Sequence, residues 1–163
     1  MATRKSSETE PLGTLEGLYA SPEFLIRRAH QLATAVFTET CSDLDLTPSQ
    51  YSALFALRER SPIGQNELGR LIALDRSTTS VVVKILRDRG LVDSTADDSD
   101  RRKSFLALTN EGRLLLAKAE KRNSRASQQL LSVFDKKQTS AFLELLDKLA
   151  GSLGTKTGTG TGK

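Results

Sequence analysis

The sequence predicts a mainly α-helical fold with one small β-hairpin. Apolar side chains keep helical spacing through most of residues 21–153, which is typical of amphipathic helices. The period shortens to two only around residues 91–108, as expected for a pair of short strands. Most of the predicted helices also begin at Ser, Thr or Asp, the side chains that cap helix N-termini.

Length and composition fit a single domain with short appendages. The chain has 163 residues, of which 37% are hydrophobic and 27% charged, as in ordinary globular proteins. No apolar run approaches the roughly 20 residues that span a bilayer, and the N-terminus lacks a secretory signal pattern. Cys41 is the single cysteine, so no internal disulfide is expected. We therefore expect a cytoplasmic protein.

Caps and apolar spacing define the predicted helices, which run over residues 21–41, 47–61, 65–72, 75–89, 109–133 and 135–153. Ser21-Pro22 and Thr47-Pro48 each place a capping side chain before a proline that suits the first helical position. Gly90 suits the left-handed residue that ends a helix. Residues 1–20 are expected to form a partly disordered extension, and residues 154–163 a disordered low-complexity tail.

Two strands follow Gly90. Residues 91–94 and 103–108 have strand character, and the acidic segment 96–100 between them reads as a turn. A two-stranded hairpin is marginal alone, so it must pack against the helices. A short helix, a three-residue turn, a longer helix and a hairpin make up, in this order, a winged helix-turn-helix. The second helix of this motif enters the DNA major groove.

The helix over residues 75–89 has two contrasting faces. A helical wheel assigns the core side to Thr79, Val82, Ile85 and Leu86, with Thr78 nearer the core than the solvent. The opposite side carries Arg76, Ser77, Ser80, Lys84 and Arg87. Short polar side chains let the backbone approach base edges, and longer cations reach phosphates. This face therefore predicts DNA binding, although a merely solvated helix face has similar composition.

The predicted hairpin tip carries concentrated charge. Three of the four residues 97–100 are acids, and Arg101, Arg102 and Lys103 follow at once. A cation at this tip can enter a narrow, negative minor groove, and a neighbouring carboxylate can hold its guanidinium extended. A solvated loop is the alternative interpretation.

The stretch over residues 68–116 resembles the MarR family (multiple antibiotic resistance regulators) of bacterial transcription factors. The motifs that carry the resemblance are Leu74-Asp75-Arg76-Ser77, Arg89-Gly90-Leu91-Val92, Asp100-Arg101-Arg102 and Leu108-Thr109-x-x-Gly112. The flanking helices also fit, so the resemblance covers about residues 21–153. It implies a homodimeric repressor on a pseudo-palindromic duplex operator, associated with the nucleoid when bound. The family's wing pair falls on Asp100 and Arg102, and its recognition-helix contacts on Arg76, Ser77 and Thr78.

Residues 21–153 are expected to contain a DNA-binding part and a dimerisation part. Residues 47–109 would form the winged helix-turn-helix, and residues 21–44 and 110–153 the terminal dimerisation helices. The last helix has an apolar face, consisting of Phe142, Leu145, Leu146 and Leu149, that the winged lobe is too remote to cover. A further apolar patch precedes the first helix and consists of Leu12, Leu15, Leu18 and Tyr19. Both patches predict burial against a second copy.

A small aromatic acid or phenol is the effector that the resemblance implies, bound where the first helices meet the winged lobe. Arg27, His30 and Tyr51 could supply a cation, an imidazole and a stacking face. The alternatives are that Arg27 is fully solvated, that His30 is a half-buried side chain with a local partner, and that Tyr51 is a core residue.

Other functions have weaker support. Cys41 suggests an oxidation-sensing repressor, but Asp43 and Asp45 close by discourage thiolate formation. A winged-helix module that binds protein is a further alternative. The sequence lacks catalytic motifs, a metal-ligand set and dinucleotide-binding glycines, so no enzyme activity, metal or cofactor is expected.

Overall fold

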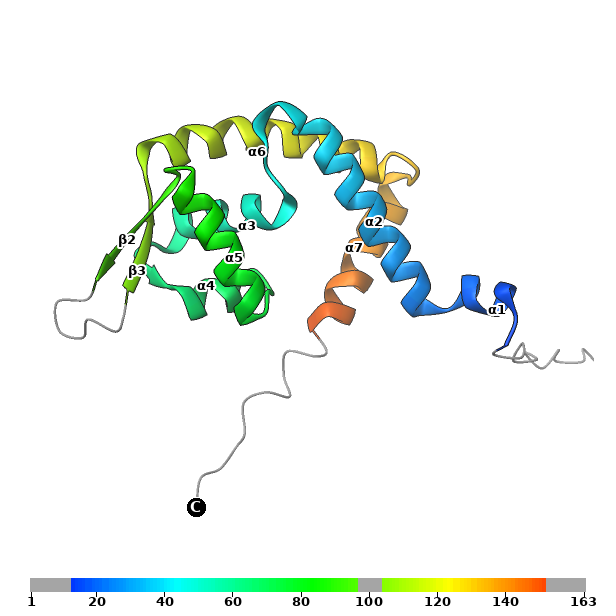
Figure 1. Ribbon diagram of the computed structural model, residues 1–163. Coiled ribbons are helices and arrows are strands. Elements are labelled where there is room, and N and C mark those ends of the chain that lie inside the picture. Colours follow the sequence, from blue (N-terminus) through cyan, green and yellow to red (C-terminus); the bar gives the residue numbers. More distant parts are fainter. Residues whose placement is uncertain (1–12, 97–103, 152–163) are drawn as a thin grey trace, which may run out of the picture.

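The computed structural model describes residues 13–96 and 104–151 (Figure 1). Its elements, in chain order, are α1 (Leu15–Ala20), α2 (Pro22–Thr40), the 3-10 turn η1 (Ser42–Leu44), α3 (Pro48–Arg60), β1 (Ile63–Gly64), α4 (Gln65–Leu71), α5 (Arg76–Asp88), β2 (Val92–Ala96), β3 (Ser104–Leu108), α6 (Asn110–Leu131) and α7 (Lys136–Gly151). The mainly helical fold class is confirmed. Every predicted helix is present, and its ends lie within a few residues of the prediction.

The strands form a small antiparallel sheet of order β1-β3-β2. Val92 pairs with Leu108 across the predicted hairpin, and Ile63 of β1 pairs with Leu106 on the other edge of β3. The third strand was not predicted, because two residues cannot show an alternating pattern. β1 joins the helix-turn-helix directly to the wing, so the wing has the third strand that an isolated hairpin lacks.

The core of the described residues lies between the end of α2, η1, α3, α4, α5, the sheet and the first half of α6. Its most completely buried large side chains are Leu54, Leu57, Leu68, Leu86, Leu106 and Leu116. The start of α6 packs closely on the segment that enters the wing, since a Cβ at Gly112 would lie 2.1 Å from the Leu91 carbonyl oxygen. Thr109 reinforces this junction by donating to the Gly90 carbonyl at 2.8 Å.

The predicted N-terminal extension contains a helix. α1 begins at a Thr14 cap and packs on α2, where the rings of Tyr19 and Phe24 lie 5.2 Å apart. The other predictions for the chain ends and the hairpin tip, over residues 1–12, 97–103 and 152–163, lie outside the described residues.

Apolar side chains remain exposed on the side of the molecule opposite the wing, where α1, the first half of α2 and α7 lie (Figure 1). α7 buries none of its residues within the protomer. No helix in the described ranges is long and apolar enough to cross a membrane.

Candidate nucleic-acid interface

The helix-turn-helix is held together by a close contact between its two helices. A Cβ at Gly69 of α4 would lie 2.7 Å from the Thr79 hydroxyl and 3.2 Å from the Leu74 carbonyl oxygen. Thr79 is 1% exposed and donates to the Asp75 carbonyl at 2.7 Å, so its side chain is fixed. Only glycine therefore fits at position 69. The close contact of Gly69 with Thr79 and Leu74 sets the position of α5 against α4.

Asp75 organises the start of α5. Its carboxylate accepts from the Thr78 amide at 2.9 Å, the Ser77 hydroxyl at 2.6 Å and the Thr78 hydroxyl at 2.5 Å. The bond from Ser77, followed by those from Thr78, lowers the pKa of Asp75 well below its ordinary value. The carboxylate is therefore ionised at neutral pH, and it holds both hydroxyls in fixed positions at the exposed tip of the helix.

The two faces of α5 largely match the predicted ones. Thr79, Val82 and Leu86 are buried as predicted. Ile85 is 37% exposed, so its predicted core position is wrong; Val83, at 3% exposed, lies in the core instead. The reason is that the core contacts the side of α5 that carries Val83, which leaves Ile85 at the edge of the buried face. Thr78 is exposed, so the wheel was wrong to place it near the core.

All five predicted recognition residues of α5 are exposed, namely Arg76, Ser77, Thr78, Ser80 and Lys84. They differ in their partners. The Lys84 ammonium pairs with the Asp88 carboxylate one turn later, so its charge is partly neutralised. Arg76 has no ion-pair partner among the residues that the structure describes, and it lines a hollow of about 240 Å³ between α4 and α5 together with Arg70.

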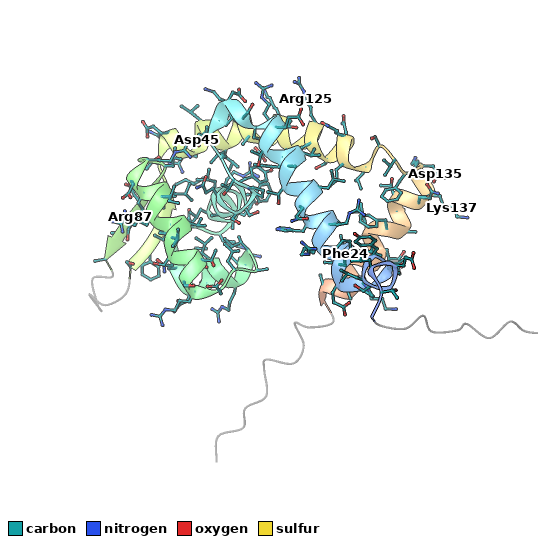
Figure 2. All side chains as sticks on the ribbon, turned by 45° about the vertical axis from the view of Figure 1, so that its right-hand side comes forward. Phe24, Asp45, Arg87, Arg125, Asp135 and Lys137 are labelled. Atoms are coloured by element: carbon teal, nitrogen blue, oxygen red, sulfur yellow. The ribbon has the colours of Figure 1, made fainter. Side chains whose placement is uncertain are left out.

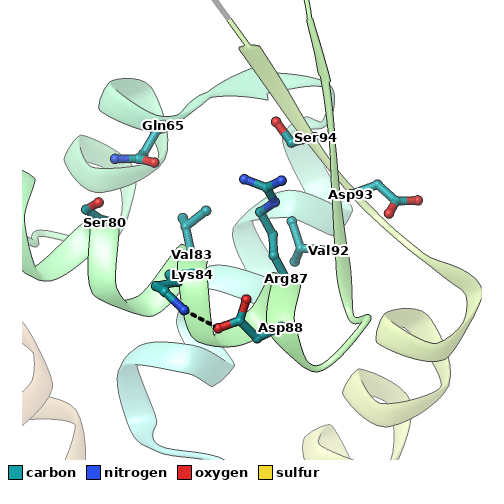
Figure 3. Close-up of a pocket in the computed structure, with 9 residues that line it drawn as sticks. All are labelled: Gln65, Ser80, Val83, Lys84, Arg87, Asp88, Val92, Asp93 and Ser94. Carbon is teal, nitrogen blue, oxygen red and sulfur yellow. Dashed lines mark hydrogen bonds and ion pairs between the residues drawn. The ribbon is translucent and has the colours of Figure 1, made fainter.

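A larger open groove of about 590 Å³ separates α5 from the wing. Its lining residues are Gln65, Ser80, Val83, Lys84, Arg87, Asp88, Val92, Asp93 and Ser94 (Figure 3). The Arg87 guanidinium extends into this groove toward Ser94 (Figure 3). Within the described ranges Arg87 has no hydrogen-bond or ion-pair partner, so its charge is available to a ligand.

Sequence reasoning placed Arg87 on the polar face but did not include it among the expected contacts. It also missed Gln65, Asp93 and Ser94, which β1 and the wing bring beside α5. The groove depends on long-range packing, which leaves no local signal in the sequence. The predicted wing pair, Asp100 and Arg102, lies outside the described residues.

The predicted effector residues are not brought together. Arg27 and His30 are exposed on the open half of α2, and the Arg27 guanidinium lies 5.0 Å from the Phe24 ring centroid. Tyr51 lies further along, where its ring is 5.6 Å from that of Phe37. Seven residues separate His30 from Phe37, which is about 10 Å along a helix.

Tyr51 is half-buried where α2, α3 and α6 meet. Its hydroxyl lies 3.4 Å from the Asn123 amide nitrogen, and its ring is 6.2 Å from that of Phe55. Burial is the main cause that raises the pKa of Tyr51. The side chain is thus partly a core residue, and one edge of it remains accessible.

Cys41 does not have the environment of a sensor thiol. It is 1% exposed, and burial, followed by the charge of Asp43, raises its pKa. The described part of the chain also contains no cluster of three or more His, Cys, Asp or Glu side chains placed to hold a metal ion.

A helix-turn-helix beside a three-stranded wing, with cations and hydroxyls on the exposed face of its second helix, defines a winged helix-turn-helix protein of the nucleic-acid-binding class. The MarR family model matches residues 46–104. The HTH-type transcriptional repressor NicR of Pseudomonas putida is 34% identical over 128 residues, which are 78% of this chain and 81% of NicR. The chain belongs to the MarR family of transcriptional regulators.

Solved structures agree with this assignment. PcaV from Streptomyces coelicolor, in complex with its natural ligand, matches with a TM-score of 0.78 and 32% identity, covering 83% of this chain and 96% of PcaV. BpsR of Bordetella bronchiseptica, whose DNA binding is regulated by 6-hydroxynicotinic acid, matches with a TM-score of 0.76 and 29% identity, covering 81% of this chain and 94% of BpsR.

Proposed function

We propose that this protein is a homodimeric transcriptional repressor that binds a pseudo-palindromic duplex operator and is released by a small aromatic acid or phenol. The observation that carries the proposal is the exposed face of α5 beside the groove that Arg87 enters, with no partner for Arg87 in the described part of the chain. The cytoplasm, with association to the nucleoid when bound, is the proposed location.

The α5 residues divide into two proposed roles on DNA. Arg76, Ser77, Thr78 and Ser80 lie toward the helix start, where side chains reach base edges in the major groove. Lys84 and Arg87 lie in the second half, where cations meet the phosphate backbone. Arg102 held by Asp100 is the proposed minor-groove contact, on the basis of the family's wing pattern alone.

The exposed apolar side chains support the dimer. Leu145 and Leu146 of α7 are 65% and 43% exposed, and Leu25 and Ile26 of α2 are 49% and 47% exposed. These helices lie on the same side of the molecule, away from the wing (Figure 2). A monomer rarely leaves this many large apolar side chains exposed on one side, so a second copy is the proposed cover. Phe142 is only half-buried, stacked 5.2 Å from Phe134 within the protomer.

The effector proposal rests on relatives and on the accessibility of three side chains. BpsR is regulated by an aromatic acid, and PcaV was solved with a natural ligand. Arg27 and His30 lie on the half of α2 that the protomer leaves open, so a pocket that uses them needs a further wall. The partner protomer would supply this wall, and Tyr51 would belong to the inner end of the site.

The test of DNA binding begins with selection of duplexes by the full-length protein from a random pool. We expect enrichment of a pseudo-palindrome whose half-site centres lie about 10 bp apart, one helical turn. Anisotropy titrations of the selected duplex and its scrambled version then measure specificity. Equal affinity for the two would contradict the proposal and favour the protein-interaction alternative.

The effector is tested separately by thermal-shift screening against hydroxybenzoates and pyridine carboxylates. A compound that binds the folded protein raises its melting temperature, and the same compound should release the selected duplex. His30→Ala should leave affinity for DNA nearly unchanged and raise the effector concentration needed for release. Loss of DNA binding by His30→Ala without any effector would show that His30 has a structural role.

A further inference from the structure

The turn η1, which directly follows α2, connects α2 to the core of the winged lobe. Cys41 and Leu44 are 1% and 8% exposed, so the turn is anchored in the core. Its last residue is followed by Asp45 in the left-handed conformation, with φ 48° and ψ 51°. On one side, the Asp43 carboxylate pairs with Arg122 of α6 at 2.8 Å.

Arg89 connects this junction to the recognition helix. It is the C-cap residue of α5, and its guanidinium donates to the carbonyl oxygens of Asp45 and, at 3.1 Å, of Leu44. The Asp45 carboxylate lies 3.8 Å from the same group. The Arg89 side chain is only 28% exposed, so the protein surface holds it in place.

The chemistry of this contact requires arginine. Two adjacent backbone carbonyls need donors that diverge at a fixed angle, and the planar guanidinium provides them. A lysine ammonium is a point charge on a flexible stem, and it cannot hold both oxygens in the same way. Arg89 thus resists rotation of α5 against the η1 segment that follows α2, not only separation of the two.

We propose that Arg89 is a positioning residue that sets the distance between the two recognition helices of the dimer. The inference rests on the proposed function, in which α2 contributes to the dimer and α5 reads DNA. α2 packs along α6 and α5 belongs to the winged lobe, so the contact joins the dimerising part to the reading part. Two recognition helices reach successive major grooves only when held roughly 34 Å apart.

The geometric test measures the distance between recognition helices in the free dimer. A spin label at Ser80→Cys reports on α5, because Cys41 is buried and remains unlabelled. We expect double electron–electron resonance to give a narrow distance distribution with Arg89 present and a clearly broader one in Arg89→Gln. Arg89→Lys keeps the charge, and the width of its distance distribution should lie between those of the other two proteins. If Arg89→Gln does not fold, a broader distribution in Arg89→Lys than in the wild type still tests the proposal. Lys121→Gln, which removes an exposed charge from α6, is the matched control. Its distance distribution should remain as narrow as that of the wild type.

The functional test uses duplexes selected by the unmodified protein, with the half-site spacing changed by one or two base pairs. We expect the ratio of affinities for native and altered spacing to fall about tenfold in Arg89→Gln, as expected for loss of a charged hydrogen-bonded contact. Unchanged distance distributions and an unchanged ratio, with affinity lowered equally for every spacing, would overturn the proposal. An absence of dipolar coupling in the protein that retains Arg89 would contradict the homodimer itself, and the proposal would fall with it.

Discussion

Three arginines of the winged lobe differ in what their guanidinium groups contact, and this separates their roles. Arg58 pairs with Glu120 of α6 at 2.7 Å and lies over the Phe55 ring, so it joins α3 to α6. Arg89 holds the η1 carbonyls. Arg87 alone of the three extends into the groove beside the wing. A residue's place on a helical wheel does not distinguish such roles, because the partners come from other elements.

Arg87→Gln should weaken binding to every duplex. It should also reduce the magnitude of the negative slope of log affinity against log salt by about 0.9, the effect of one lost phosphate contact. Lys84→Gln should have a smaller effect, because Lys84 is already paired with Asp88. Anisotropy titrations over a salt series measure both slopes. A larger slope change for Lys84→Gln than for Arg87→Gln would contradict the assignment.

Asp75 should confer a pH-dependent stability on α5. Its folded pKa lies below the ordinary value of 3.8, so the ionised carboxylate stabilises the folded state fully above that value. The stabilisation is lost as pH falls from about 3.8 through the folded pKa. The melting temperature of the wild type should therefore exceed that of Asp75→Asn by a constant margin from pH 7 to about pH 5, and the margin should shrink toward pH 3. A margin that grows on acidification would show that the bonds to Ser77 and Thr78 do not favour the ionised form.

At the scale of elements, the two helices of the helix-turn-helix approach each other closely at Gly69. The absence of a side chain at Gly69 lets α4 contact Thr79 of α5, and the turn between the helices includes Ala73 with a φ of 54°. Gly64, at the start of α4, has no atom within 4 Å of the position that a Cβ would take. The two glycines therefore provide a matched pair.

Gly69→Ala should lower the free energy of unfolding by about 1–3 kcal/mol, because overpacking forces α4 and α5 apart. Gly64→Ala should cost less, at most about 1 kcal/mol, because its φ of −72° and open surroundings suit alanine and only the weaker N-cap of α4 counts against the change. Urea denaturation of both variants measures the difference. Equal stabilities would mean that the Thr79 side chain can move aside without cost.

On the scale of the whole molecule, the chain combines a well-packed winged lobe with helices whose apolar faces are left open. α3, α4, α5 and the sheet enclose the core, and α6 extends from it toward α7 (Figure 1). α7 has no buried residue in the protomer. The second copy proposed above would complete this half of the fold.

Leu145→Glu combined with Leu146→Glu should convert the proposed dimer to a monomer at micromolar concentration, because the new charges would have to be buried in the interface. Leu114→Glu is the control: Leu114 is 66% exposed on α6, close to the winged lobe. Light scattering on the full-length proteins measures the mass. A monomeric wild type, or a double variant that remains dimeric, would contradict the proposed interface.

Local chemistry explains how much of the fold the sequence determined by itself. Caps at Ser21, Thr47, Asp75 and Thr109, together with apolar spacing, specified helix positions to within a few residues. The same spacing identified most of the exposed face of α5 and the order of the other helices and the two hairpin strands, but neither α1 nor β1. These signals act over one or two helical turns, so they are present in the sequence regardless of the final packing.

Tertiary structure alone decided the features that join distant segments. β1 pairs with β3 across more than forty residues, and Arg89 reaches carbonyls 44 and 45 residues earlier in the chain. The exposure of Ile85 and the separation of His30 from Tyr51 likewise follow from how the helices pack. Each depends on the relative placement of whole elements, which is fixed by the sum of many weak contacts in the core and not by any local pattern.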